Sequence, residues 1–235
     1  MRKKSRAMVL FSGGQDSTIS LIWALSRYEG VETLGFSYGQ RHGVEMEARQ
    51  HLIALIREHY PQFGAKLGHD KQLSLPALEE IGGSSLTEDK EIGIGKLGLP
   101  NSFVPGRNLL FFTYGAAWAW RQDISVLVGG MCEADYSGYP DCREQTLEAL
   151  QKTLELGLGS KMKLETPLMH ITKAQSWHLA EQLGGKEMVE MIMKHSHSCY
   201  MGDESPHSWG KGCGECPACI LRQKGVEEYK NGISA

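Results

Sequence analysis

A short polar segment near the start of the chain carries residue types that suit chemistry on a phosphate. The segment reads Phe11-Ser12-Gly13-Gly14-Gln15-Asp16-Ser17. It follows an apolar run at 8–11 and leads into helical spacing at 17–28, which predicts a buried strand joined to a helix. Loop amides and a helix N-terminus at the carboxyl edge of a sheet attract anions. The segment therefore predicts a phosphate site.

Each residue type in this segment has a use at such a site. Gly13 and Gly14 let the backbone approach a ligand closely, and Ser12 and Ser17 offer hydroxyl donors. Asp16 would repel a bare phosphate, so its presence makes sense if a divalent cation lies between the two. The plainer alternative is a glycine turn in which Asp16 or Ser17 only caps the helix. The segment lacks the ending of a Walker loop and the glycine spacing of a dinucleotide site.

Four of the six cysteines fall within 21 residues near the C-terminus, three of them in overlapping C-x-x-C spacings. Four thiolates suit a closed, structural zinc site, and an iron–sulfur cluster is the chief alternative. The four are Cys199, Cys213, Cys216 and Cys219. Three histidines nearby are weaker candidate ligands: His195, His197 and His207. The separate Cys132 and Cys142 are expected to be small buried residues rather than nucleophiles.

Several basic residues lie where anions would collect. Arg107 precedes a helix that Asn108 is expected to cap, and Lys173 lies in the first turn of another helix. A cation is disfavoured at a helix N-terminus, so both positions favour a bound anion. Arg41 and His42 follow a predicted strand end, where ligands gather in open α/β sheets. They are predicted to neutralise phosphates or a substrate carboxylate, with plain solvent exposure as the alternative.

The elements that would position these residues alternate between strands and helices. Short apolar runs, partly β-branched, predict strands, and apolar residues three and four apart predict helices. The expected strands lie at 8–11, 31–36, 65–67, 124–128 and 163–165. The expected helices lie at 17–28, 44–59, 108–121, about 141–156 and 172–183, with a short terminal helix to 229. This alternation predicts an α/β fold with a parallel sheet.

Local signals refine this outline. The pairs Asp141 with Glu144, and Thr172 with Gln175, have the spacing of a capping box at a helix start. Residues 70–107 hold six glycines and little periodicity. A loop of that length is typical of a functional segment.

A length of 235 residues suits one large domain with a small appendage. The formal net charge is −3 at pH 7. We expect a domain at 1–190 and a cysteine module at 191–235. The charge balance argues against wrapping duplex nucleic acid. The apolar runs are too short for a secretory signal or a membrane span. We therefore expect a reducing cytoplasm, where clustered cysteines favour a metal over disulfides.

The segment at 12–17 resembles the PP-loop of the ATP pyrophosphatase (N-type) superfamily, whose members cleave ATP between the α and β phosphates and form an adenylated intermediate. Five further segments, in order, narrow the resemblance to the 7-cyano-7-deazaguanine synthase family, also named QueC or ExsB. With the cysteine module the match spans about 9–229. The segments are FSYGQRH (36–42), FVPGRN (103–108), CEADYSGYPDCR (132–143), ETPLM (165–169) and KAQSW (173–177).

The resemblance implies a Rossmann-like parallel sheet carrying the PP-loop, similar to adenine nucleotide alpha hydrolases, with a small C-terminal zinc module. It implies that Mg-ATP and ammonia convert 7-carboxy-7-deazaguanine into 7-cyano-7-deazaguanine (preQ0) in queuosine biosynthesis. The route passes through an adenylated carboxylate and an adenylated amide, releasing AMP and pyrophosphate. The resemblance also implies one structural zinc per chain on the four cysteines, and a homodimer. The charge balance and the short apolar runs lead us to expect no stable binding of nucleic acid or membrane.

The resemblance also assigns roles to single residues. The ATP-binding residues are Phe11, Ser12, Gly13, Gly14, Gln15, Asp16, Ser17, Thr18, Ile19, Ser20 and Leu21. The catalytic residues are Asp16, Ser17, Arg107 and Lys173, with the two cations stabilising charge on the transferring phosphoryl group. The substrate-binding residues are Arg41, His42, Glu133, Asp135 and Tyr139. A carboxylate can accept N–H donors from a guanine-like edge and a tyrosine can stack on it. For Asp141 the role of a helix cap is favoured.

Three other functions remain open from the sequence. A relative with the same loop could add sulfur or an amino acid to a tRNA base, although the only basic run is near residues 2–6. Another could keep the fold and modify a protein acceptor. A third possibility is a zinc-ribbon interaction module without catalysis, against which the intact PP-loop argues.

Overall fold

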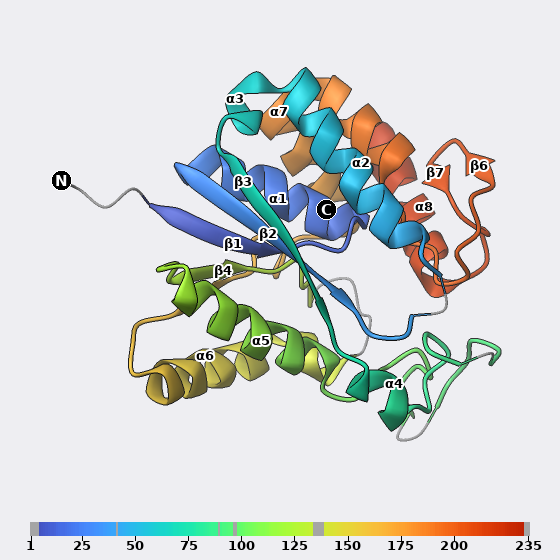
Figure 1. Cartoon of the computed structure of the whole chain (residues 1–235). Helices are drawn as coiled ribbons and strands as arrows, with labels where there is room; N and C mark the ends of the chain where they lie inside the picture. The colour runs from blue at the N-terminus through green and yellow to red at the C-terminus, as the bar shows by residue number, and fades with distance from the viewer. Residues whose placement is uncertain (1–4, 41, 89, 96–97, 134–138, 233–235) are drawn as a thin grey trace.

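A computed structural model of the chain describes residues 5–40, 42–88, 90–95, 98–133 and 139–232. Its centre is one parallel sheet of five strands in the order β3-β2-β1-β4-β5, with helices on both faces (Figure 1). The strands are β1 (Arg6–Leu10), β2 (Gly30–Ser37), β3 (Leu67–Ser74), β4 (Val126–Val128) and β5 (Lys163–Glu165). The expected α/β fold with a parallel sheet is confirmed.

The strand order places a crevice next to β1. The chain builds outward from β1 through β2 and β3, then returns to the other side of β1 with β4 and β5. Val9 of β1 pairs with Thr33 on one side and Val128 on the other. The loops that follow β1 and β4 therefore leave the sheet in different directions. Open α/β sheets bind ligands at such a switch point, beyond the carboxyl ends of the strands.

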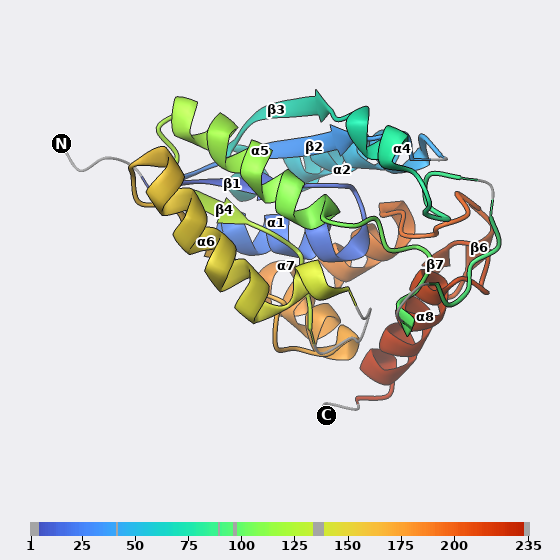
Figure 2. The same ribbon diagram turned by 90° about the horizontal axis from the view of Figure 1, so that it is seen from below.

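The helices divide between the two faces of the sheet, as Figures 1 and 2 show. One face carries α1 (Gln15–Arg27), α2 (Val44–His59), α3 (Pro61–Gly64) and α7 (Lys173–His195). The other carries α5 (Arg107–Arg121) and α6 (Glu144–Leu158). A buried cluster containing Ile22 and Trp177 fills the first interface, and one containing Met8 and Phe112 fills the second. Within the described residues, no helix is long and apolar enough to cross a membrane.

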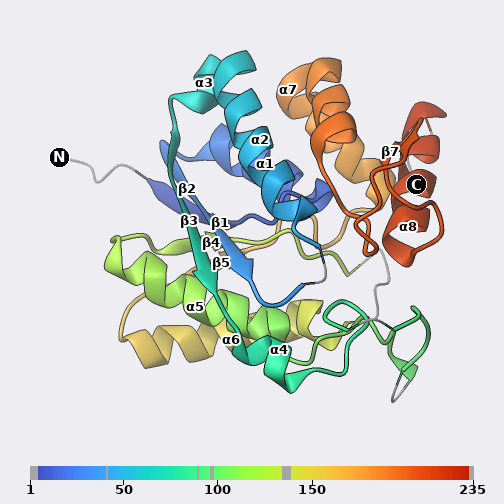
Figure 3. The same ribbon diagram turned by 45° about the vertical axis from the view of Figure 1, so that its right-hand side comes forward.

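The C-terminal cysteine module packs beside α7 (Figure 3). It contains β6 (Pro206–His207), β7 (Gly210–Lys211) and α8 (Pro217–Lys230). Cys199, Trp209 and Val226 belong to the same buried cluster as the α1–α7 interface. The buried Arg222 donates to the carbonyls of Met193 at 2.7 Å and Ser196 at 3.2 Å. These bonds satisfy carbonyls at the end of α7, so the module is joined to that helix. The expected boundary between domain and module, at residue 190, falls inside α7.

Two predicted elements differ in extent from those observed. The strand expected at 65–67 is β3 and runs to Ser74, and α4 (Ala77–Ile81) follows it, so the predicted loop at 70–107 begins later. The β3 side chains are mostly exposed, which removes the apolar pattern that marks a strand. The helix expected at 172–183 continues as α7 to His195, past a kink at Gly185 where φ is 79°.

The predicted helix starts have mixed outcomes. The capping box of Thr172 and Gln175 is confirmed at α7. The expected Asn108 cap is wrong, because α5 already begins at Arg107 after Gly106, whose φ is 72°. The Asp141 capping box is also wrong. The short 3-10 turn η2 (Pro140–Cys142) precedes α6, and the Asp141 carboxylate accepts from the backbone N and Nδ2 of Asn108 at 3.0 and 3.1 Å.

Candidate active site

The glycine-rich loop joins β1 to α1 in a tight turn held by its own hydroxyl groups. The Ser12 and Ser17 hydroxyls lie 3.0 Å apart, and Thr18 Oγ1 donates to the Gly14 carbonyl at 2.7 Å. Gly13 has φ +90°, and a Cβ there would lie 2.7 Å from the Glu45 carbonyl oxygen. Only glycine fits at this point, since the first turn of α2 packs directly against the loop.

A buried arginine from α2 fixes the start of the loop. Arg49 Nε donates to the Phe11 carbonyl at 2.8 Å, and its Nη1 donates to Asp70 Oδ2 at 2.8 Å. Gly35 makes room for it, because a Cβ there would lie 2.7 Å from Arg49 Nε. Burial lowers the pKa of Arg49, and the Asp70 charge acts against that shift. The guanidinium thus ties the loop to β2 and β3.

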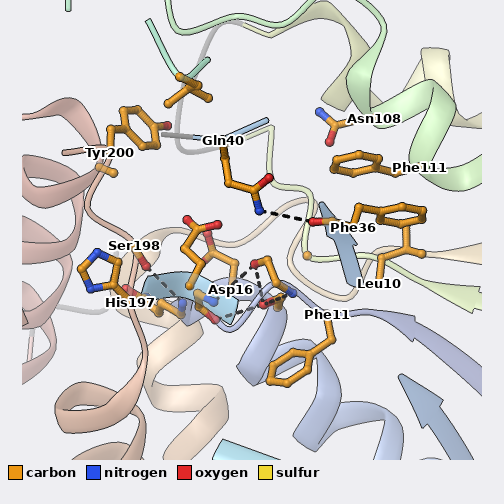
Figure 4. A pocket seen from close by; sticks show the side chains of 18 of the residues that line it. Leu10, Phe11, Asp16, Phe36, Gln40, Asn108, Phe111, His197, Ser198 and Tyr200 are labelled. Carbon is orange, nitrogen blue, oxygen red and sulfur yellow. Dashed lines mark hydrogen bonds between the residues drawn. The ribbon is translucent and has the colours of Figure 1, made fainter. Parts of the chain in front are cut away.

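The segment that enters the cysteine module holds the other side of the loop. His197 N donates to the Gly13 carbonyl at 3.1 Å, and Gln15 N donates to Ser198 Oγ at 3.2 Å. Figure 4 shows both side chains beside the loop, across from Phe111. Ser198 therefore acts as a cap for α1, whose own N-cap residue, Gly14, provides no side-chain hydrogen bond.

A cavity of about 330 Å³ opens above this loop. It lies at the carboxyl edge of the sheet, where the strand order predicts a ligand site. The predicted site residues that line it are Phe11, Ser12, Gly14, Gln15, Asp16, Ser17, His42, Arg107, Tyr139 and Lys173. Gly13 belongs to the loop but faces α2. The last four predicted residues, Thr18, Ile19, Ser20 and Leu21, are buried within α1. Arg41 and Asp135 lie outside the described residues.

Lys173 and Asp16 meet at the mouth of the loop although they are far apart in sequence. The Lys173 ammonium donates to the two carboxylate oxygens of Asp16 at 2.9 and 2.8 Å. The lysine is mostly buried, with 13% of its side chain exposed, and Asp16 is 34% exposed. The pair places a cation and a metal-type ligand at the N-terminus of α1. This arrangement suits a phosphate chain with a divalent cation.

Arg107 lies against an aromatic wall of the cavity that Tyr38 and Phe111 form, and Phe111 lies across from Ser198 in Figure 4. Arg107 Nη1 donates to the Tyr38 hydroxyl at 3.2 Å, and its guanidinium lies 5.9 Å from the ring centre of Phe111. Burial opposes its charge, yet nearby oxygens, foremost that of Tyr38, raise the pKa of Arg107 above its ordinary value. Its Nε is buried with no partner among the described residues. A charged, incompletely satisfied guanidinium thus faces a site lined by rings.

The remaining predicted substrate residues do not share one place. Tyr139 lines the cavity and its hydroxyl lies 2.6 Å from Ser102 Oγ. His42 also lines it, with Nε2 buried and unpartnered in the described part of the chain. Glu133 lies elsewhere, because its Oε2 accepts from the backbone N of Glu144 at 3.0 Å, at the start of α6. Glu133 is not among the residues that line the cavity.

The two isolated cysteines line the cavity wall. Cys132 Sγ donates to the Ile171 carbonyl at 3.2 Å. Burial, with the Asp141 charge, raises the pKa of Cys142 to about 12. A thiol that keeps its proton at neutral pH is a poor nucleophile. The raised pKa of Cys142 argues against a nucleophile there, but both cysteines are half-buried and line the cavity, so neither is the fully buried residue expected.

The four cysteines of the module come together as predicted. Their sulfur atoms all lie within 4.8 Å of one another, and among the described residues they are the one such group that could hold a metal ion. Cys213 N and Cys216 N donate to the sulfur atoms of Cys199 and Cys213 at 3.4 and 3.3 Å. Gly212 leaves the space open, since a Cβ there would lie 2.4 Å from Cys219 Sγ. This sulfur cradle fits a tetrahedral metal ion.

The three histidines weighed as ligands have other surroundings. His195 Nδ1 lies 3.1 Å from Nε2 of His51, and His207 stacks on Trp209. Burial lowers the pKa of His197, whose ring nitrogens have no hydrogen-bond partner in the described residues. None of the three joins the sulfur cluster.

Several cavity residues carried no signal that singled them out in the sequence. They are Tyr38, Glu45, Phe111, Ser198 and Tyr200. Aromatic residues in strands and helices usually pack in the core, and an acid in the first turn of a helix is ordinary. Ser198 was findable only through its position beside a predicted metal ligand. Their shared location depends on tertiary contacts between segments far apart in the chain.

Known protein sequences are similar to this chain over nearly its full length. The family model described as "Queuosine biosynthesis protein QueC" matches residues 6–230. A 7-cyano-7-deazaguanine synthase of Bordetella pertussis is 55% identical over 230 residues, covering 97% of this chain and 94% of that protein. One of Caulobacter vibrioides is 52% identical over 229 residues, covering 97% and 95%.

A solved structure shares the fold. The crystal structure of a 4-thiouridine synthetase–RNA complex with bound ATP has a TM-score of 0.54 and 16% identity. The match covers 97% of this chain and 52% of that chain, so the present chain spans about half of its length.

Proposed function

Because the chain belongs to the family of the queuosine biosynthesis protein QueC, we propose that it converts 7-carboxy-7-deazaguanine, ammonia and ATP into 7-cyano-7-deazaguanine. The curated relatives named for this product cover almost the whole chain. It is thus an ATP-dependent ligase that forms carbon–nitrogen bonds.

The observation that carries this proposal is the joint placement of loop, ion pair and aromatic wall in one cavity. The loop and the Lys173–Asp16 pair lie at one end. Tyr38, Phe111 and Arg107 lie at the other. The first end suits the phosphates of ATP, and the second suits a flat ring bearing a carboxylate. The reacting carboxylate and the α-phosphate would then meet between them.

The reaction needs activation because a carboxylate does not lose oxide. Attack of a carboxylate oxygen on the α-phosphorus forms the acyl adenylate and releases pyrophosphate. Ammonia displaces AMP to give the amide, whose oxygen is adenylated in turn, and loss of that AMP leaves the nitrile. The loop amides and hydroxyls would orient the phosphates, while Lys173 and Arg107 would stabilise charge in both adenylations.

Two metals are part of the proposal. Asp16 would hold magnesium beside the phosphates, where the ion supplies charge neutralisation and orientation. The cluster of Cys199, Cys213, Cys216 and Cys219 would hold one zinc in a closed structural site. Its four sulfur donors and its lack of an oxygen ligand support a structural role rather than a catalytic one.

The cysteines and the net charge bear on the compartment of the reaction and on its acceptor. None of the six cysteines forms a disulfide, which supports a reducing cytoplasm as the compartment. Free deazaguanine as the acceptor makes RNA unnecessary, in keeping with the net charge of −3. We carry over a homodimer from the family resemblance.

The test is turnover by the purified protein without RNA. Incubation with 7-carboxy-7-deazaguanine, ammonium and Mg-ATP should give the amide and then the nitrile by mass spectrometry. AMP and pyrophosphate should be the other products, two of each for every nitrile. Absence of both amide and nitrile, with the protein folded and metal-loaded, would overturn the proposal. Turnover only when a tRNA or a protein acceptor is added would favour one of the two rival acceptors.

A further inference from the structure

Two carboxylates line the cavity within the described part of the chain, and they have different surroundings. Asp16 is held by Lys173 at the loop. Glu45 lies on the first turn of α2, and its own backbone presses on the loop at Gly13. Its position relative to the glycine-rich loop is therefore fixed by the packing of α2 on that loop.

Two charged groups from other elements act on Glu45, Arg107 of α5 and Cys199 of the cysteine module. Burial raises the pKa of Glu45 to about 7, while Arg107 lowers it in part and Cys199 adds to the rise. Near neutral pH such a carboxyl exchanges its proton readily, which is the range a general base needs. The other titratable or charged groups lining the cavity are Tyr38, His42, Tyr139, Tyr200, His197, Cys132, Cys142, Asp16, Lys173 and Arg222.

The proposed reaction creates a specific demand for a base. Formation of the acyl adenylate transfers no proton. When ammonia attacks it, a C–N bond forms, the C–O bond to AMP breaks, and the nitrogen must lose a proton. After the amide oxygen is adenylated, the nitrogen loses two more protons. As the last N–H bond breaks, its electron pair forms the final C–N bond and AMP leaves with the C–O pair.

Resting on that proposed function, we propose that Glu45 is the general base that takes these protons from the nitrogen. It lines the same cavity as the loop and lies on the helix that packs against the loop. The other carboxylate, Asp16, is engaged by Lys173. The Cys142 thiol keeps its own proton at neutral pH. Glu45 accepts one proton in amide formation and two in succession in nitrile formation, and it passes each proton to solvent before it accepts the next.

The test separates the two half-reactions in Glu45→Gln. Substrate-dependent exchange of pyrophosphate into ATP reports adenylation, which needs no base, and should stay close to wild type. Formation of amide and nitrile should fall by about 10²- to 10⁴-fold. The inflection near pH 7 in the wild-type rate should disappear, while the rise due to free ammonia remains. Glu47→Gln, an exposed acid on the same turn, is the matched control and should behave as wild type.

Each result decides the inference separately from the proposed function. Equal loss of exchange and product formation would overturn it, since Glu45 would then serve substrate binding or folding. Unchanged product formation would overturn it as well. Partial recovery in Glu45→Asp with a retained pH inflection would support it. If the wild-type protein makes neither amide nor nitrile, the proposed function itself fails.

Discussion

The glycine-rich loop and the cysteine cluster both depend on glycine at a crowded position, but their side chains face different surroundings. Both need glycine where a Cβ would clash, at Gly13 in the loop and at Gly212 in the cluster. The loop turns its hydroxyls and the Asp16 carboxylate toward a cavity. The cluster turns four sulfur atoms toward one another, and three of its cysteines are buried. Glycine thus lets α2 pack against the loop in one region and lets the sulfur atoms come together in the other.

The two regions meet through the residues that lead into the cluster. His197 and Ser198 bond to Gly13 and Gln15 just before the chain reaches Cys199. Cys199 of the sulfur cluster is therefore one residue away from a direct contact with the glycine-rich loop. The difference teaches that the cysteines, although conspicuous in the sequence, adjoin and help to hold the loop to which we assign the chemistry.

The largest effect should come from opening the cluster. Cys216→Ser removes a buried sulfur that no other described group can replace. Structural zinc contributes on the order of 10 kcal/mol to folding in small metal domains, so we expect loss of bound metal and a strongly lowered Tm. Elemental analysis and calorimetry measure both. Cys132→Ser, outside the cluster, should retain the metal; if Cys216→Ser also retains it at full stability, the scaffold role is wrong.

The next effect concerns charge at the loop. Lys173→Met removes the cation that holds Asp16, and loss of one preorganised charge-stabilising group typically lowers kcat by about 10²- to 10³-fold. We expect that loss in both half-reactions with little change in Tm, measured by pyrophosphate exchange and product formation. Lys186→Met, exposed on the same helix, should be neutral. Normal pyrophosphate exchange in Lys173→Met would contradict the role of Lys173 at the phosphates.

A smaller effect should appear at the junction of the two regions. Ser198→Ala leaves Gln15 N without its acceptor, and loss of a helix cap costs about 1 kcal/mol, or roughly fivefold in affinity. We expect the KM for ATP to rise by that factor while the metal content stays complete. Ser26→Ala, at the far end of α1, is the control. An unchanged KM for ATP would show that the Ser198 contact does not affect ATP binding at the loop.

The smallest effect should come from Glu133. Because its carboxylate caps α6 through Glu144 N, Glu133→Ala should lower stability by about 1 kcal/mol and leave the KM for 7-carboxy-7-deazaguanine unchanged. Thermal unfolding and steady-state kinetics measure the two. A raised KM for the deazaguanine with unchanged stability would return Glu133 to the substrate site.

The sequence was informative where a signal is local. The loop at 11–17, the capping box at Thr172 and the cysteine spacings each depend on residues close together in the chain, and all three take their expected form. The edge strand β3 was underestimated because its side chains face solvent and lack an apolar pattern.

Long-range partners could not be predicted. Asp141 was expected to cap its own helix, and it serves α5 through Asn108, 33 residues away. The sequence predicts that Lys173 binds phosphate, and it gives no sign that Lys173 also donates to Asp16, 157 residues away. Both contacts exist because the parallel sheet brings the carboxyl ends of separate strands to one edge. No spacing along the chain encodes them.

The most direct test of adenylation at the loop follows the oxygen atoms of the substrate. With 7-carboxy-7-deazaguanine labelled with ¹⁸O in both carboxylate oxygens, we expect each of the two AMP molecules released per nitrile to carry one labelled oxygen, measured by mass spectrometry. Label appearing in inorganic phosphate, or AMP without label while nitrile accumulates, would contradict adenylation and with it the role assigned to this loop.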